Sequence, residues 1–153
     1  MEQKTVFPRT HISLFVSDIG ETVAFYDKFF NESAAKVKDD YAKYELDAPA
    51  LTISFIQNPE KVNTSGHYGI QVKTKEELNE KLNLARGHKL VELEEAETAC
   101  CYAIQDKFWV NDPDGYEWEV YHFLGDDENF GSREDVEGEP CCEKAEKVGA
   151  ACC

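Results

Sequence analysis

Two segments of this chain repeat one pattern, and this repeat restricts the fold more than any other feature of the sequence. In His11–Val16, aliphatic residues fill every second position, which predicts a strand with one buried face. His67–Val72 alternates in the same way. Asp18 and Thr74, separated by the same interval as the two histidines, each stand three residues before a glutamate, a pattern typical of a helix N-terminus. The chain is therefore expected to hold two related modules, each opening with a strand and a helix.

Further strands are expected after each helix. The last hairpin of each half turns at residues suited to turns, Asp47–Ala50 and Asp112–Gly115. These turns lie further apart than the two histidines do, so the second half has gained about nine residues, around 94–101, which we expect to form an inserted loop. The predicted fold is α+β, with two βαβββ modules, at about residues 9–60 and 65–124, that form a curved mixed sheet around a cavity.

Residues 125–153 at the end of the chain are acidic and show no periodicity, so we expect them to form a disordered tail. They include two pairs of adjacent cysteines, Cys141–Cys142 and Cys152–Cys153. The sequence leaves two roles open for these thiols: they bind soft ions, or they are incidental.

The overall charge and the cysteines limit the partners. A formal net charge of −15 repels phosphate backbones and anionic lipids, so neither nucleic acid nor a membrane surface is expected as a partner. The N-terminus has no apolar signal segment, and no run approaches the roughly 18 apolar residues of a membrane span, which predicts a cytoplasmic protein. Thiols stay reduced there, so the adjacent Cys100 and Cys101 are expected to bind a soft ligand rather than to form disulfides.

Two histidines and a glutamate are the candidates for metal ligation. His11 and His67 occupy equivalent places in the two modules, as a pseudo-twofold metal site requires. Glu117 and Glu119 share one face of the last predicted strand, so periodicity does not choose between them, whereas His122 falls on the opposite face.

The run Asp112-Pro113-Asp114-Gly115-Tyr116-Glu117-Trp118-Glu119 resembles the closing hairpin of the glyoxalase, bleomycin-resistance and extradiol dioxygenase superfamily. Members of that superfamily have the vicinal oxygen chelate fold. With the two histidines included, the resemblance covers approximately residues 9–124. It implies that Glu119, rather than Glu117, ligates a metal together with His11 and His67.

The residue at position 54 bears on the identity of the metal. The interval between the two hairpin turns makes Ser54 the first-module counterpart of Glu119, and a serine hydroxyl is a poor metal ligand. Two histidines and one carboxylate remain, the facial triad that holds Fe(II) with open positions for substrate and dioxygen. Fe(II) is therefore the expected cofactor and dioxygen the co-substrate, although the same donors also bind Mn(II), Cu(II) or Zn(II).

The stretch from Cys100 to Gly115 is similar to the branch of this superfamily that contains organoarsenical C–As lyases and cadmium-induced proteins. The resemblance implies that Cys100 and Cys101 bind a trivalent organoarsenical, such as methylarsenite, beside the metal. An Fe(II)-dependent reaction of dioxygenase type would then cleave the carbon–arsenic bond and release arsenite. The sequence does not choose between methyl and aromatic arsenicals, or between a monomer and a homodimer.

Two other functions compete with this one. The first is a resistance protein that binds arsenic or cadmium on its thiols without turnover, which the tail cysteines favour. The second is a glyoxalase-like enzyme, against which Ser54 argues because those enzymes generally fill all four pseudo-symmetric ligand positions.

Overall fold

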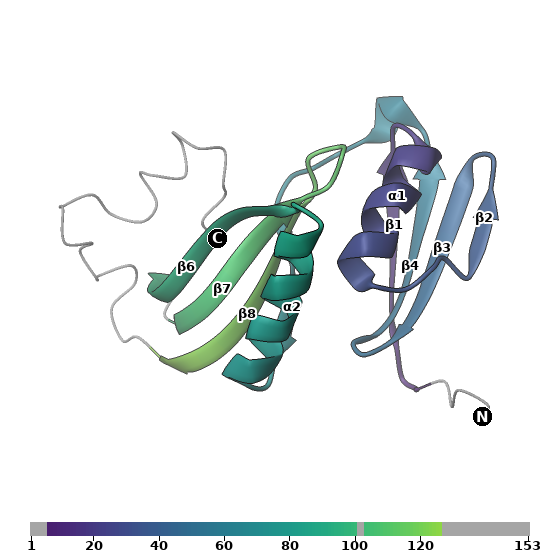
Figure 1. Ribbon diagram of the computed structural model, residues 1–153. Coiled ribbons are helices and arrows are strands. Elements are labelled where there is room, and N and C mark those ends of the chain that lie inside the picture. Colours follow the sequence, from purple (N-terminus) through teal and green to yellow (C-terminus); the bar gives the residue numbers. More distant parts are fainter. Residues whose placement is uncertain (1–5, 101–102, 127–153) are drawn as a thin grey trace. The chain divides into compact units, whose positions relative to one another are not determined.

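The computed structural model describes residues 6–100 and 103–126, which form two compact units (Figure 1). The first unit contains the described residues up to Asn63 together with Asp112–Gly115, and the second contains the others from Thr64 on. No helix in these ranges is long and apolar enough to cross a membrane. The two units correspond to the two modules that the repeat predicts.

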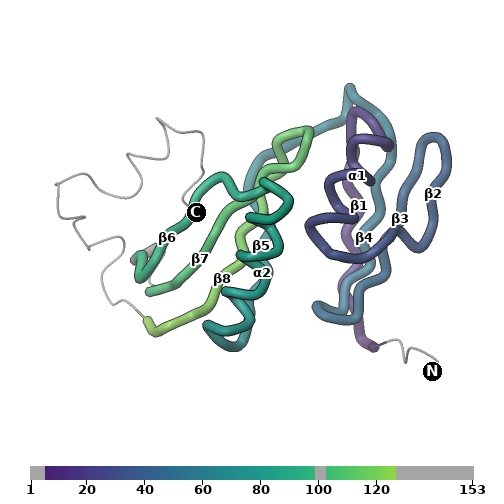
Figure 2. Tube along the Cα trace, in the orientation of Figure 1, coloured from purple at the N-terminus to yellow at the C-terminus, as the bar shows by residue number. Residues whose placement is uncertain are grey.

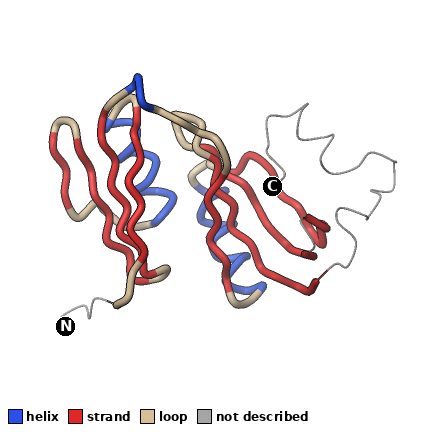
Figure 3. Tube along the Cα trace, turned by 180° about the vertical axis from the view of Figure 1, so that it is seen from behind, coloured by secondary structure: helices blue, strands red, loops and turns tan. Residues whose placement is uncertain are grey.

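The first unit is a four-stranded sheet with one helix on one of its faces (Figure 3). The strand order is β1-β4-β3-β2, with β1 parallel to β4 and the other neighbours antiparallel. The elements are β1 (Thr10–Val16), α1 (Ile19–Phe30), β2 (Lys36–Lys38), β3 (Tyr41–Asp47), β4 (Ala50–Gln57) and a short 3-10 helix, η1 (Pro59–Lys61).

Helix α1 begins and ends at residues suited to those positions. The carboxylate of Asp18 accepts a hydrogen bond from the backbone N–H of Glu21 at 2.8 Å, and Asn31 ends the helix in the left-handed conformation at φ 54°. Between them, the Tyr26 ring packs 4.3 Å from the ring of Phe55, centroid to centroid. Ring pairs of this kind add about 0.5–1.5 kcal/mol beyond their burial, so they fix the face of the sheet that α1 covers.

The turn Asp112–Gly115 packs with the first unit, although the sequence assigns it to the second module. The Tyr26 hydroxyl donates a hydrogen bond to Asp112 Oδ2 at 3.0 Å in the interior, and the backbone N–H of Ser17 donates to Asp114 Oδ2 at 2.9 Å. The two carboxylates therefore hold the turn against α1 and against the residue that precedes its N-cap.

The second unit repeats this architecture, as predicted. Its strand order is β5-β8-β7-β6, again with a parallel pair, β5 and β8, at one side (Figure 2). A complete capping box starts its helix: Glu77 N–H donates to the Thr74 hydroxyl, and the Glu77 carboxylate accepts from the backbone of Thr74. The elements are β5 (His67–Val72), α2 (Lys75–Gly87), β6 (Val91–Cys100), β7 (Ala103–Asn111) and β8 (Glu117–Asp126).

The expectation of a loop around residues 94–101 is wrong: these residues belong, up to Cys100, to β6, which pairs with β7 in a long hairpin. Most of the extra residues lengthen this hairpin: β6 has 10 residues where β2 has 3, and β7 has 9 where β3 has 7. A bulge between Glu95 and Thr98, where Glu97 takes a positive φ of 49°, accommodates one residue without a partner. The Glu97 N–H, freed from the ladder, donates to Asp106 Oδ1 at 2.8 Å. Strand β8 also continues to Asp126, two residues beyond the expected end of the module.

Candidate metal and substrate site

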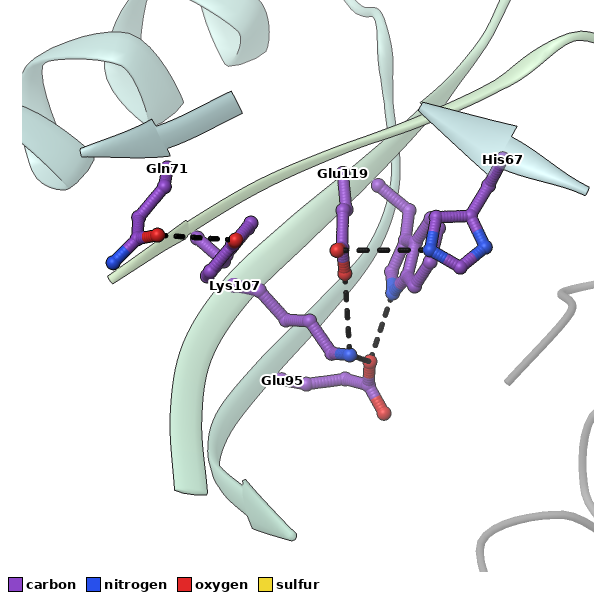
Figure 4. Close-up of polar contacts among 7 residues, drawn as sticks. His67, Gln71, Glu95, Lys107 and Glu119 are labelled. Carbon is purple, nitrogen blue, oxygen red and sulfur yellow. Dashed lines mark hydrogen bonds and ion pairs between the residues drawn. The ribbon is translucent and has the colours of Figure 1, made fainter. Parts of the chain in front are cut away.

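One face of the second sheet carries a continuous group of polar side chains (Figure 4). The strand register pairs Gly69 with Glu119 and His67 with Glu117, so His67 and Glu119 lie on the same face of neighbouring strands. His67 Nε2 lies 3.7 Å from Glu119 Oε1. Glu119 is therefore the carboxylate that approaches His67, and its side chain is only 12 % exposed.

A glycine makes room for this carboxylate, a feature that our reading of the sequence did not single out. A Cβ atom at Gly69 would lie 3.1 Å from Glu119 Oε1 and 3.3 Å from the Tyr121 ring. Such contacts are tighter than ordinary van der Waals packing, so the glycine permits the close approach of the Glu119 side chain to β5.

A buried lysine contacts the other oxygen of the same carboxylate. Lys107 Nζ lies 3.4 Å from Glu119 Oε2 and 4.0 Å from Glu95 Oε2, and the lysine side chain is 2 % exposed. The indole of Trp109 donates from Nε1 to Glu95 Oε2 at 2.8 Å, and Lys107 Nζ stands 5.1 Å from that ring's centroid. Sequence reasoning missed Lys107 and Glu95 because their proximity depends on the pairing of three strands.

Tyr121 and Gln71 extend the polar face along the sheet. Burial raises the pKa of Tyr121 above its ordinary value, and the nearby Glu119 carboxylate raises it further while Lys107 opposes the change. The phenol therefore stays protonated at neutral pH. Its hydroxyl donates to Gln71 Oε1 at 3.2 Å.

The first unit carries the counterpart of the His67–Glu119 pair. Ser13 pairs with Ser54 in the register in which Gly69 pairs with Glu119, so Ser54 occupies the predicted equivalent position. His11 Nε2 lies 3.3 Å from the hydroxyl of Ser54, a buried residue. The two histidines therefore occupy equivalent positions but face different groups. His11 faces a hydroxyl in the first unit, and His67 faces a carboxylate in the second.

The donors in the second unit fit a divalent metal ion. Typical metal–nitrogen and metal–oxygen bonds of about 2.0–2.2 Å allow one ion to bridge a nitrogen and an oxygen up to about 4.2 Å apart, and the 3.7 Å between His67 and Glu119 lies within that reach. Neither unit, over its described residues, contains a third His, Cys, Asp or Glu that completes a cluster with them. Ligation by His11, from the other unit, stays a prediction.

Of the two predicted thiol ligands, only the backbone of Cys100 lies within the described residues, at the far end of the β6–β7 hairpin. Cys100 is the last residue of β6, and its backbone pairs with Ala103. Cys101 and the tail residues Cys141, Cys142, Cys152 and Cys153 lie outside the described residues.

Comparison with known proteins gives a family and several relatives. Residues 9–120 match the profile of the Glyoxalase/Bleomycin resistance protein/Dioxygenase superfamily. The chain is 42% identical over 114 residues, 73% of its length and 71% of the relative's, to a trivalent organoarsenical cleaving enzyme of Bacillus sp. (strain MD1). It is 35% identical over 149 residues, 94% of its length and 98% of the relative's, to the cadmium-induced protein CadI of Mycobacterium bovis.

Solved structures agree on the fold. The chain superposes on lactoylglutathione lyase from Agrobacterium tumefaciens with a TM-score of 0.59 and 15% identity, covering 76% of this chain and 94% of that one. The predicted two-module α+β fold of the vicinal oxygen chelate type is therefore confirmed.

Proposed function

Because the chain belongs to the glyoxalase, bleomycin resistance protein and dioxygenase superfamily, we propose that it cleaves the carbon–arsenic bond of trivalent organoarsenicals such as methylarsenite and releases arsenite. In this proposal Fe(II) is the cofactor and dioxygen the second substrate, which is reduced as the methyl carbon leaves as an oxidised one-carbon fragment. The approach of His67 Nε2 to Glu119 Oε1, at positions that the internal repeat singles out, is the observation that carries it.

We assign the metal ligands to His67 and Glu119 in the second module and His11 in the first. Imidazole and carboxylate donors suit Fe(II), and a set of two histidines and one carboxylate leaves coordination positions open. Bound there, Fe(II) would supply those positions for dioxygen and substrate. The ammonium of Lys107 lies beside the buried carboxylate of Glu119 and pairs with one of its two oxygens.

The thiols of Cys100 and Cys101 would bind the substrate. Trivalent arsenic is a soft acceptor, and methylarsenite offers two exchangeable positions to two neighbouring thiolates. The similarity to a trivalent organoarsenical cleaving enzyme of Bacillus supports this substrate class.

The strand register favours one alternative, a protein that binds metalloids on its thiols without turnover. Ala103, the pairing partner of Cys100, lies six residues along β7 from Trp109, the pairing partner of Glu119. At about 3.3 Å per residue, this is about 20 Å of strand. Catalysis requires the bound arsenical to come closer to Glu119 than that, whereas sequestration does not.

Arsenite production separates the two functions. Protein purified without oxygen is loaded with Fe(II) and mixed with methylarsenite and air, and arsenite is quantified for the wild type, His67→Ala and Cys101→Ser. The lyase predicts arsenite from the wild type alone. Methylarsenite bound tightly by the wild type and by His67→Ala, with no arsenite released, would instead indicate a sequestering protein.

A further inference from the structure

The charged side chain of Lys107 is buried on the second sheet, beside the candidate metal ligand Glu119. Its side chain is 2 % exposed, and its ammonium lies 3.4 Å from Glu119 Oε2 (Figure 4). A buried charge is destabilising unless it is paired, so a lysine in this place needs the carboxylates around it. Neither the relatives' names nor the superfamily match assigns this residue a role.

Several contacts restrain the lysine where it is. Glu95 lies on the neighbouring strand β6, and its Oε2 is 4.0 Å from Lys107 Nζ. That same oxygen accepts the 2.8 Å hydrogen bond from Trp109 Nε1, so the partner of the lysine is itself fixed. The Trp109 ring, 5.1 Å from Nζ, adds a cation–π contact.

The two oxygens of Glu119 therefore have different neighbours. Oε1 faces His67 at 3.7 Å, and Oε2 faces Lys107 at 3.4 Å. On the β5 side, the absence of a side chain at Gly69 lets Oε1 remain where it is. The carboxylate is oriented from both sides, with only one oxygen directed to the histidine.

The first module lacks this arrangement. By strand register, Tyr41 is the first-module counterpart of Lys107, and Lys38, which pairs with Tyr41, is the counterpart of Glu95. Ser54 occupies the position of Glu119. The second module, in which His67 faces Glu119, thus has a lysine between two carboxylates. The first module, in which His11 faces Ser54, has no lysine at that position.

We propose that Lys107 is a positioning residue that holds Oε2 of Glu119, so that Oε1 alone is presented to a divalent ion shared with His67. The inference rests on the metal site of the proposed function. A carboxylate that ligates through one oxygen uses one coordination position, and one that ligates through both uses two. Lys107 thereby keeps a position open for a small molecule.

A purely electrostatic role makes the opposite prediction for metal affinity. An ammonium near a divalent cation repels it, so removing the charge without any loss of positioning would tighten metal binding. Loss of a partner that orients a metal ligand typically costs about 10- to 100-fold in affinity. The sign of the change therefore distinguishes the two roles.

The test is anaerobic titration with Co(II) as the probe ion, followed by its visible absorption and X-ray absorption spectra, with no arsenical present. Lys107→Met removes the charge and the donor while keeping the length of the side chain. Lys73→Met, at an exposed position of the same module, is the matched control for loss of one charge. Lys107→Arg keeps the charge, but its planar guanidinium engages both oxygens of a carboxylate.

We expect Lys107→Met to bind Co(II) about tenfold more weakly than the wild type, with a spectrum that shows a higher coordination number. Lys107→Arg should also bind more weakly, and Lys73→Met should match the wild type. Unchanged or tighter binding by both Lys107 variants, with an unchanged spectrum, would overturn the inference. If Lys107→Met does not fold, the Lys107→Arg result decides alone.

The same titration separates this inference from the proposed function. If wild-type protein binds no Co(II), or if His67→Ala and Glu119→Gln bind it as the wild type does, the metal site itself is wrong. If those two variants lose binding and the Lys107 variants do not, only the role of Lys107 is wrong.

Discussion

The two modules share a topology and a strand register, and they differ in the residues that face their histidines. In the first, His11 faces a buried serine hydroxyl, and in the second, His67 faces the carboxylate of Glu119. The second module also has the buried Lys107 and a longer hairpin. A repeat can therefore keep its backbone while the side chains around equivalent positions diverge.

The largest effect is expected from making the second module resemble the first. Glu119→Ser places in the second module the residue that the first has at the equivalent position, and removes the carboxylate next to His67. Loss of an outer-shell partner costs up to about 100-fold in metal affinity, and loss of the ligand itself should cost more. Arsenite production should stop. Anaerobic metal titration and the arsenite assay measure both losses. Ser54→Ala is the comparison, and it should lose less affinity than Glu119→Ser, because it removes a contact of His11 and not a proposed ligand.

Tyr26→Phe tests how the Asp112–Gly115 turn is held. The variant loses the buried hydrogen bond from the hydroxyl to Asp112 Oδ2 and leaves that carboxylate less well satisfied. Hydrogen bonds to charged groups contribute about 1.5–3 kcal/mol, so the free energy of unfolding should fall by about 2 kcal/mol in urea denaturation. A stability equal to that of the wild type would show that water replaces the phenol at no cost.

Gly69→Ala probes the close approach that only the second module makes. The new Cβ would lie 3.1 Å from Glu119 Oε1, whereas the first module already has Ser13 at the equivalent position. A displaced ligand should weaken metal binding about tenfold, the lower end of what loss of ligand orientation typically costs. The matched change Ser13→Ala should leave the affinity unaltered, and equal effects of both variants would contradict the comparison.

The smallest effect concerns Asp106, which fixes the bulge that the first module lacks. Burial pushes its pKa upward, but the hydrogen bond from Glu97 N–H and the charges of Lys75 and His122 outweigh burial and hold the pKa below its ordinary value. A carboxyl whose pKa is lower in the folded state than in the unfolded state stabilises the fold at any pH above its unfolded-state pKa. This stability is lost as the pH falls through the folded-state pKa.

Asp106→Asn should therefore be less stable than the wild type at neutral pH. The difference should shrink below about pH 4, as the wild-type carboxyl protonates, and urea denaturation over a pH series measures it. A destabilisation that stays constant down to acid pH would mean that the charge of Asp106 contributes nothing.

The sequence predicted what depends on local pattern. The repeat of the alternating segments located β1 and β5, and the capping residues Asp18 and Thr74 located the starts of both helices. The interval between the two hairpin turns identified Ser54 as the counterpart of Glu119. These features follow from alternation and capping chemistry, which operate over a few residues.

Features that depend on pairing between strands were missed. Residues 94–101 were expected in a loop because the interval between the two hairpin turns places about nine extra residues there, and the bulge that lets them pair with β7 has no local signal. Lys107 looks like an ordinary solvated lysine until β6, β7 and β8 are placed in register. The room at Gly69 likewise appears only when Glu119 stands opposite it.

In the proposed function, His11 of the first module joins His67 and Glu119 of the second as ligands of one ion, and anaerobic titration with Fe(II) tests this proposal. We expect one ion per chain, with affinity lost in each of His11→Ala, His67→Ala and Glu119→Gln. If His11→Ala binds Fe(II) as tightly as the wild type while the other two variants lose it, the site belongs to the second module alone and the proposed ligation by His11 is wrong.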